Sequence, residues 1–206
     1  MKSGARKIIR VILIFNLAAL AAVGVFVMRE GSFSLTAFPK KPTLPYLGVV
    51  NDFELTAKDG RPFRQENLMK QPWIASFMFT SCAGQCPVMN ARLERLQKEL
   101  PEGIFLVSFS VDPLTDTPEV LRSYAKKYHA DENRWFFLTG QKSEIDQVLS
   151  NFYMNGSDNP SLHSFRLVLV DSQSNLRGFY DSLDENSIRQ LLKDVKKLVK
   201  ENPNGR

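Results

Sequence analysis

Two cysteines, Cys82 and Cys86, are the residues of this 206-residue chain with the widest range of chemistry. They occur in the segment Ser-Cys-Ala-Gly-Gln-Cys-Pro, after an apolar run and before a helical pattern. Pro87 suits the first turn of a helix, so we expect Cys86 near a helix N-terminus, where the helix dipole favours a thiolate. Gly84 lets the short loop bend and bring the two sulfur atoms together.

The residues alone leave four interpretations of this pair open: inert buried thiols, a structural disulfide, a redox pair or metal ligands. An oxidising compartment argues against inert free thiols, and so short a loop gains little stability from a disulfide. Dithiol oxidoreductases usually have two residues between their cysteines, whereas this chain has three. Three intervening residues still allow both sulfur atoms to meet one soft metal ion.

A metal ion held by two thiolates needs a further ligand, and the chain has two histidines. His129 ends an amphipathic helix, where a cation suits the helix C-terminus and water. His163 precedes an expected strand, in a loop of the kind where sites gather in layered α/β folds. Two thiolates and one imidazole suit Cu(I), which accepts three ligands, whereas zinc prefers four. Met89 lies in an apolar helical stripe and is interpreted as a core residue.

The elements expected around these residues alternate between strands and helices. Strands are expected near 53–56, 73–80, 104–111, 135–138, 165–170 and 176–180, and helices near 86–100, 117–129, 143–153 and 184–199, with Thr117 and Ser143 as caps. The last two strands are joined by a short turn and must be antiparallel, so the sheet is mixed. We therefore predict an α/β thioredoxin-like sandwich. A small doubly wound domain is the rival, but it would lack the terminal hairpin.

The N-terminal residues have the character of a membrane anchor. Residues 11–28 are apolar apart from Asn16, and about 20 such residues cross a bilayer as a helix. Basic residues precede the run, which predicts a cytoplasmic N-terminus and an exported domain. A cleaved signal peptide is the competing interpretation, but its apolar core is usually shorter and residues 26–30 form a poor cleavage site. We expect a single-pass protein of a bacterial inner membrane with its C-terminal domain in the periplasm.

The distribution of charge argues against nucleic-acid binding. The chain has a formal charge of +5, but residues 1–30 account for +4 of it, so the folded part has no basic stripe. We predict a basic cytoplasmic N-terminus at 1–10, an anchor at 11–30, a tether rich in proline and glycine at 31–48, a folded domain at 49–200 and a disordered tail at 201–206. The domain is long enough to be stable without disulfides, which leaves both cysteines free for chemistry.

Several segments in order resemble the Sco/SenC family of membrane-anchored copper chaperones: FTSCAGQCPVM, SFSVDPLTDTPEVLRSYAKKY, WFFLTG and HSFRLVLVDSQSNLRGFYD. The resemblance covers roughly residues 47–200. It implies a thioredoxin-like fold, with Cys82, Cys86 and His163 as copper ligands and Cys82–Cys86 as the redox pair. Many relatives have proline directly after the first cysteine, whereas this chain has Ala83, which implies a more flexible loop.

The resemblance also implies a role and partners. The protein would deliver copper to, or reduce the cysteines of, the binuclear copper site in cytochrome c oxidase subunit II, with a periplasmic copper donor or thiol reductant as its second partner. The leading prediction is thus a copper-binding assembly factor rather than a turnover enzyme.

The alternative is a thiol–disulfide oxidoreductase or thiol peroxidase of the same fold without an obligate metal, which would use an exposed Cys86 of low pKa. A membrane-tethered redox sensor is a third interpretation, with no docking motif to support it. Asp112 can orient a site residue or form a turn, and Asp116 can cap the next helix, so neither is assigned to the site.

Overall fold

The computed structural model describes residues 44–154 and 165–201 of the chain. The expected N-terminal segment at 1–10 and anchor at 11–30 lie outside the described residues, as do His163 and most of the expected tether and tail. Within the described ranges, no helix is both long enough and apolar enough to span a membrane.

The described residues form one mixed sheet with helices on both faces. The strands are β1 (Gly48–Val49), β2 (Glu54–Ala57), β3 (Pro62–Arg64), β4 (Trp73–Met78), β5 (Phe105–Ser110), β6 (Trp135–Thr139), β7 (Arg166–Val170) and β8 (Asn175–Asp181). The helices are η1 (Gln65–Leu68), α2 (Cys86–Glu99), α3 (Pro118–Lys127), α4 (Lys142–Asn151) and α5 (Glu185–Glu201).

The order of the strands in the sheet is β1-β8-β7-β4-β5-β6-β2-β3. Strand β4 pairs in parallel with β5, and β5 pairs in parallel with β6. On its other side β4 is antiparallel to β7, which forms an antiparallel hairpin with β8. The expected mixed sheet and terminal hairpin are therefore confirmed. The strand that leads into the cysteine loop lies in the middle of this sheet.

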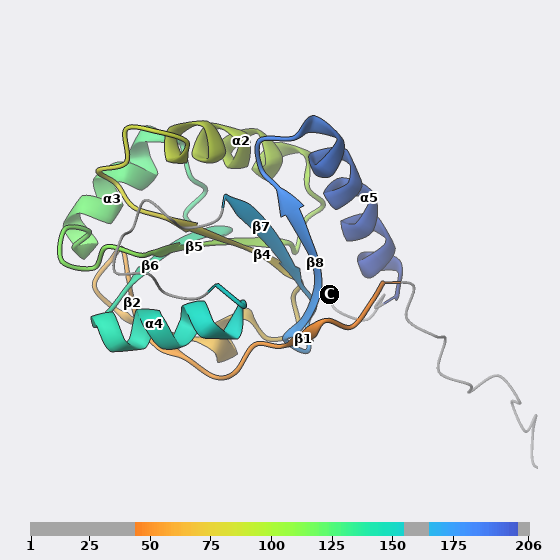
Figure 1. Ribbon diagram of the computed structural model, residues 1–206, viewed down its shortest axis with the longest axis horizontal. Helices are drawn as coiled ribbons and strands as arrows, with labels where there is room; N and C mark the ends of the chain where they lie inside the picture. The colour runs from red at the N-terminus through yellow and green to blue at the C-terminus, as the bar shows by residue number, and fades with distance from the viewer. Residues whose placement is uncertain (1–43, 155–164, 202–206) are drawn as a thin grey trace, which may run out of the picture. The chain divides into compact units, whose positions relative to one another are not determined.

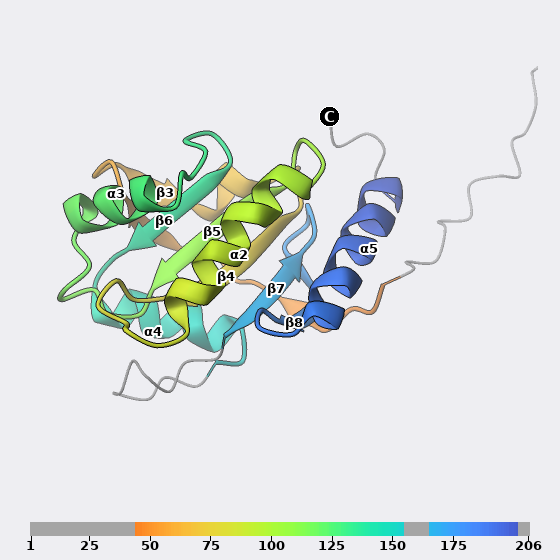
Figure 2. The same cartoon turned by 90° about the horizontal axis from the view of Figure 1, so that it is seen from above.

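The helices divide into two layers (Figure 1). Helices α2, α3 and α5 pack their apolar side chains on one face of the sheet, and α4 packs on the opposite face. Seen from above, α2 lies across the sheet over β4 and β5 (Figure 2). Two apolar cores, one on each face, thus hold β4 and α2 in place.

Local sequence explains why β4 and α2 form where they do. Every residue of β4 is buried, which fits a run of apolar residues without alternation in a strand covered on both faces. On α2, Met89, Leu93 and Leu96 are buried at helical spacing, and Pro101 follows the helix end. Met89 is completely buried in the core, as predicted.

The two predicted helix caps have different outcomes. Thr117 caps α3, because its side-chain oxygen accepts a hydrogen bond from the backbone N–H of Val120 at 3.4 Å. The prediction of Ser143 as the cap of α4 is wrong, because the N-cap is Gln141. The carboxylate of Glu144 accepts a hydrogen bond from the backbone N–H of Gln141 at 2.8 Å. The helix therefore begins at Lys142, before Ser143.

Contacts of the folded domain begin at Leu44, within the segment expected to be a tether. The Leu44 side chain is buried, and Arg177 on β8 donates to the carbonyl oxygens of Leu44 at 2.9 Å and Pro45 at 3.0 Å. Gly48 and Val49 then pair with β8 as the edge strand β1. These bonds join the incoming chain to the β7–β8 hairpin.

Candidate functional site

The cysteines lie in the loop that joins the C-terminal end of β4 to α2. The backbone N–H of Cys82 donates to the carbonyl of Phe79 at 3.3 Å, which closes a turn directly after the strand. Cys86 is the first residue of α2, and Gln85 is its N-cap. Both thiols are free. The loop therefore places one cysteine over the helix N-terminus and the other within its first turn.

The structure makes the two thiols unequal in exposure. Cys82 is half-buried, whereas Cys86 is 1% exposed. The expectation of an exposed Cys86 is wrong, because Cys86 belongs to the buried face of α2, three residues before Met89 and seven before Leu93. Only Cys82 is presented to a partner or solute.

The surroundings of Cys82 favour its thiolate. Partial burial acts to raise the pKa of Cys82, but hydrogen bonds from the backbone N–H and the thiol of Cys86 and from the amides of Gly84 and Gln85 outweigh it and lower the pKa. A Cβ at position 84 would lie 3.9 Å from the Cys82 sulfur, so this sulfur lies over the loop backbone that supplies the amides. Local hydrogen bonds therefore account for the lowered pKa of Cys82.

Cys86 has the opposite tendency. Burial, together with a smaller contribution from the neighbouring Cys82 sulfur, raises the pKa of Cys86 to about 12, although a backbone hydrogen bond at Phe79 acts against both. A thiolate of low pKa was expected at Cys86, and the structure assigns it to Cys82 instead. The helix N-terminus does favour a thiolate, but the amides there donate hydrogen bonds to the sulfur of Cys82, which lies in front of the helix.

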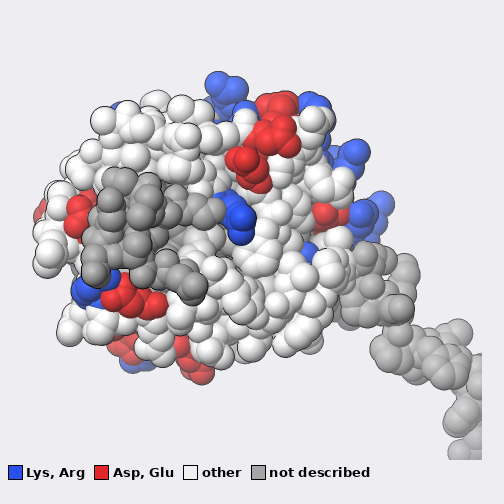
Figure 3. Space-filling view, in the orientation of Figure 1, with Lys and Arg blue, Asp and Glu red and all other residues white. Residues whose placement is uncertain are grey.

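The loop itself contributes no formal charge to the surroundings of the thiols, because residues 71–91 contain no Asp, Glu, Lys, Arg or His. The face seen in Figure 3 is accordingly mostly uncharged at its upper left, where the loop and α3 lie, and its charged side chains gather more towards α5. The loop therefore places no charged side chain of its own beside Cys82.

Two polar residues that no motif signals lie behind Cys86. Asn90 donates from its side-chain amide to the Cys86 carbonyl at 2.9 Å and to the Tyr124 hydroxyl at 3.1 Å. Burial, the neighbouring Tyr128 and the negative charge that Cys86 and Cys82 can carry all raise the pKa of Tyr124. Tyr124 therefore stays protonated behind the thiols. On the sequence it is indistinguishable from a core residue of an amphipathic helix.

A cavity of about 410 Å³ opens beside the loop. Its walls are residues 81–85 together with Phe79 and Phe165. Phe165 precedes β7, and β7 lies next to β4 in the sheet. The cavity thus joins the cysteine loop to the point where the described chain resumes, two residues after His163.

Comparison with known proteins gives the family of this chain. The SCO1/SenC family profile matches residues 44–200, which include every element of the sheet. The chain belongs to the SCO1/SenC family.

Three relatives illustrate the match. The SCO1 protein homolog of Bacillus subtilis is 32% identical over 157 residues, which cover 71% of this chain and 81% of the relative. The solved structure of BsSco, a member of the Sco family of cytochrome c oxidase assembly proteins in which a disulfide switch was identified, is 30% identical, with a TM-score of 0.67 over 78% of this chain and 97% of that one. The copper-bound ScoI structure of Arabidopsis thaliana is 26% identical, with a TM-score of 0.62 over 73% and 99% of the two chains. The fold is therefore the thioredoxin-like fold of this family.

The described part of this SCO1/SenC chain supplies two of the three expected metal ligands. In residues 44–154 and 165–201, no three side chains of His, Cys, Asp or Glu are grouped so that they could hold a metal ion. His163, the expected third ligand, lies outside these ranges. The other histidine, His129, is exposed and its Nδ1 lies 2.8 Å from a carboxylate oxygen of Glu94, in agreement with the structural role predicted for it.

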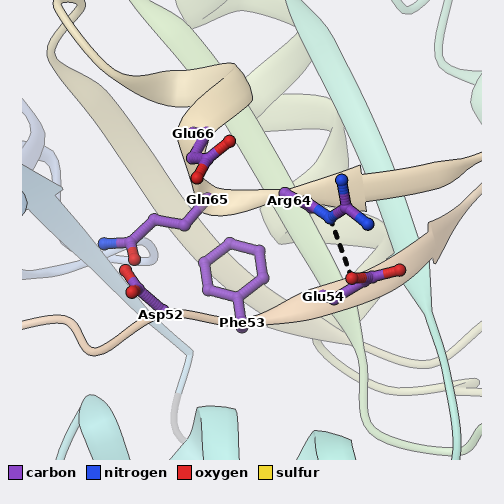
Figure 4. Close-up of a pocket in the computed structure, with 6 residues that line it drawn as sticks. All are labelled: Asp52, Phe53, Glu54, Arg64, Gln65 and Glu66. Atoms are coloured by element: carbon purple, nitrogen blue, oxygen red, sulfur yellow. Dashed lines mark hydrogen bonds and ion pairs between the residues drawn. The ribbon is translucent and has the colours of Figure 1, made fainter.

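A second hollow, of about 260 Å³, lies near the β2–β3 hairpin (Figure 4). Asp52, Glu66 and the ring of Phe53 line it, and Arg64 Nε donates to the Glu54 carboxylate at 2.8 Å along one side. No thiol lines this hollow, and the ion pair beside it is exposed. We therefore do not assign the hollow to the site that contains the cysteines.

Proposed function

We propose that this protein is a copper-binding, thiol-redox-active assembly factor for cytochrome c oxidase. It would deliver copper to the binuclear copper centre or reduce the cysteines of that centre. The observation that carries the proposal is the cavity between the Cys82 loop and Phe165. Cys82 lines this cavity, Cys86 follows its lining residue Gln85 directly, and Phe165 comes two residues after His163 in the sequence.

The sequence supplies the third ligand of the proposed site. Phe165 lines the cavity, and His163 precedes Phe165 by two residues in the sequence. The other histidine of the chain, His129, is exposed and lies beside Glu94. We therefore propose His163 as the third ligand beside Cys82 and Cys86.

The donor set suits Cu(I) as cargo. Two thiolate sulfur atoms and one neutral imidazole nitrogen form a soft, three-coordinate set. The pKa of Cys82 is lowered and that of Cys86 is raised, so Cys86 must release its proton when the metal binds and copper binding is coupled to proton release. Protonation of Cys86 then offers a way to loosen the metal during transfer.

The same pair can reduce a partner disulfide. The Cys82 thiolate attacks one partner sulfur, the partner S–S bond breaks, and a mixed disulfide forms while the other partner sulfur leaves as a thiolate that takes a proton from water. The Cys86 sulfur then attacks the Cys82 sulfur, releases the partner as a dithiol and passes its proton to the leaving thiolate. Two electrons leave the protein, which ends as the Cys82–Cys86 disulfide. A reductant of the dithiol class must restore it.

The proposal extends to location and partners. The relatives support it, since one solved Sco structure contains copper and another is named as a member of a family of oxidase assembly proteins. With the apolar run at 11–28 as an anchor, the domain would be tethered to a bacterial inner membrane and face the periplasm. Its partners there would be cytochrome c oxidase subunit II and a copper donor or thiol reductant.

The test is metal analysis of the full chain purified under anaerobic, reducing conditions after copper loading. We expect about one copper ion per chain in the wild type and in His129→Ala, and little in His163→Ala. Equal copper in the two histidine variants would remove His163 from the site. Copper absent from the wild type would contradict the function as a whole.

The accessible, acidic thiol of Cys82 favours one second candidate, a thiol–disulfide oxidoreductase without an obligate metal. A thiol peroxidase that uses Cys86 is disfavoured, because Cys86 is buried and its pKa is raised. Reduction of a model disulfide by the metal-free chain at the same rate in wild type and His163→Ala would favour the oxidoreductase.

A further inference from the structure

A buried carboxylate lies beside the cysteine loop and is not used in the chemistry described above. Asp116 is 0% exposed. Its oxygens accept the backbone N–H of Thr80 at 3.1 and 3.2 Å, the hydroxyl of Thr80, and the hydroxyl of Ser110 at 2.6 Å. Burying a carboxylate is unfavourable unless donors of this kind satisfy it. Burial nevertheless outweighs these bonds and raises the pKa of Asp116, so the carboxylate lies in the core at a free-energy cost.

The donors come from two parts of the fold that meet at the cysteine loop. Thr80 follows β4 and stands two residues before Cys82, and Ser110 is the last residue of β5. Asp116 itself is held by a turn, because its backbone N–H donates to the Asp112 carbonyl at 2.9 Å. Of the two residues considered as caps before α3, Thr117 is the N-cap, whereas the Asp116 side chain accepts hydrogen bonds from Thr80.

Thr80 controls the position of Cys82 through the backbone. The turn closed by the Cys82 N–H and the Phe79 carbonyl spans Thr80 and one further residue. Both the backbone and the side chain of Thr80 are bound to one carboxylate, so rotation at Thr80 would break both bonds. Since rotation at Thr80 would swing Cys82 away from the amides before α2, Asp116 limits that movement.

We propose that Asp116 is a positioning residue for the redox and metal site: its carboxylate holds Thr80 so that the Cys82 sulfur stays over the amides of residues 84–86 and next to the Cys86 sulfur. The inference rests on the proposed function and adds to it the residue that preorganises the first ligand. Preorganised ligands bind more tightly because less order is lost on binding.

The experiment compares four variants of the full chain. Asp116→Ala removes the acceptor, and Thr80→Val removes one donor while keeping the shape of the side chain. Thr80→Ser restores the hydroxyl. Thr117→Ala is the matched control, because it alters the adjacent residue and loses a helix cap but leaves the bonds between Asp116 and Thr80 intact.

The first readout is Cu(I) affinity, measured by competition with bathocuproine disulfonate. We expect affinity to fall about tenfold in Asp116→Ala and Thr80→Val, as for loss of a hydrogen bond to a charged group, and to stay within about twofold of wild type in Thr80→Ser and Thr117→Ala. Thermal unfolding checks that each variant is folded. If Asp116→Ala does not fold, Thr80→Val carries the comparison.

The second readout needs no copper. It is the equilibrium of the Cys82–Cys86 disulfide with glutathione, in which two glutathione thiols are oxidised to one disulfide as the protein S–S bond is reduced. Loosening the loop removes amide bonds from the reduced Cys82 sulfur, so we expect the constant for reduction to fall about fivefold in Asp116→Ala and Thr80→Val.

The outcomes separate the two claims. A wild type that binds no Cu(I) contradicts the proposed function, and the glutathione constant then still tests the role of Asp116. Folded Asp116→Ala and Thr80→Val proteins that match the wild type in both readouts would overturn the positioning role. An equal loss in Thr117→Ala would show that general stability of this junction, rather than the carboxylate, is responsible.

Discussion

At the scale of single residues, the site depends on an asymmetry between two thiols. Cys82 is accessible and has its pKa lowered by amides and by the thiol of Cys86, whereas burial keeps Cys86 protonated. A partner therefore meets Cys82 first, as a nucleophile or as a metal ligand. Cys86 acts second, after its proton has been removed or transferred. This order follows from burial and hydrogen bonding, since no formal charge lies within residues 71–91.

We predict that iodoacetamide labels Cys82 before Cys86. The labelling rate should level off below the ordinary thiol pKa of about 8.5, because the thiolate of Cys82 forms at lower pH. In Cys86→Ala the hydrogen bond from the Cys86 thiol is lost, so the pH midpoint of Cys82 labelling should rise. After brief labelling, peptide mass spectrometry measures the fraction of each cysteine that has reacted.

The control is Cys82→Ser, in which Cys86 should be labelled slowly until urea unfolds the chain. Labelling of Cys86 at least as fast as Cys82 in the native wild type would contradict the assigned asymmetry.

At the scale of elements, β4, α2 and β7 bring the site together. Strand β4 ends at the cysteine loop, α2 buries Cys86 on its inner face, and β7 begins beside the cavity. These three elements are held by the two cores rather than by bonds among the ligands. The framework is therefore expected to form whether or not metal is present.

We predict that Met89 contributes to this framework and not to metal binding. Met89→Leu keeps side-chain volume and should change the free energy of unfolding by less than about 1.5 kcal/mol, whereas Met89→Ala should lower it by about 2–5 kcal/mol. Urea unfolding measures both. Cu(I) affinity of the folded Met89→Leu chain should equal that of the wild type, and a tenfold weakening would instead identify the thioether as a ligand.

Much of this framework is predictable from the sequence, because strong periodicity decides it. The apolar runs at 73–80 and 104–111 contain β4 and β5, and the stripe through Met89 gives α2. The edge strand β1 has only two residues and carries no pattern of its own. The burial of Cys86 and the role of Asp116 are not predictable either, because both depend on how α2 and the turn before α3 dock against the sheet.

At the scale of the whole molecule, buried tyrosines make the free energy of unfolding decrease at alkaline pH. Burial raises the pKa of Tyr124, and burial and the nearby Asp194 carboxylate raise the pKa of Tyr180, whose hydroxyl donates to Asp194 at 3.1 Å. In the unfolded chain these phenols titrate at about 10. Their contribution to stability is therefore complete below pH 10 and is lost as the pH rises above it, because the unfolded chain then binds fewer protons than the folded one.

We predict that the free energy of unfolding falls between pH 9 and pH 11, measured by urea titration. Tyr180→Phe should make this fall shallower, whereas Tyr46→Phe should not, because Tyr46 is 67% exposed. An unchanged free energy over this interval would contradict the burial of these phenols.

We propose above all that Cys82, Cys86 and His163 bind one Cu(I) ion beyond the C-terminal end of the central strand β4. The most direct measurement is anaerobic Cu(I) titration of the reduced full chain against a competing chelator, with Cys82→Ser, Cys86→Ser and His163→Ala alongside the wild type. We expect about one tightly bound ion per wild-type chain and loss of tight binding in each variant. Undiminished affinity in His163→Ala, or in either cysteine variant, would contradict it.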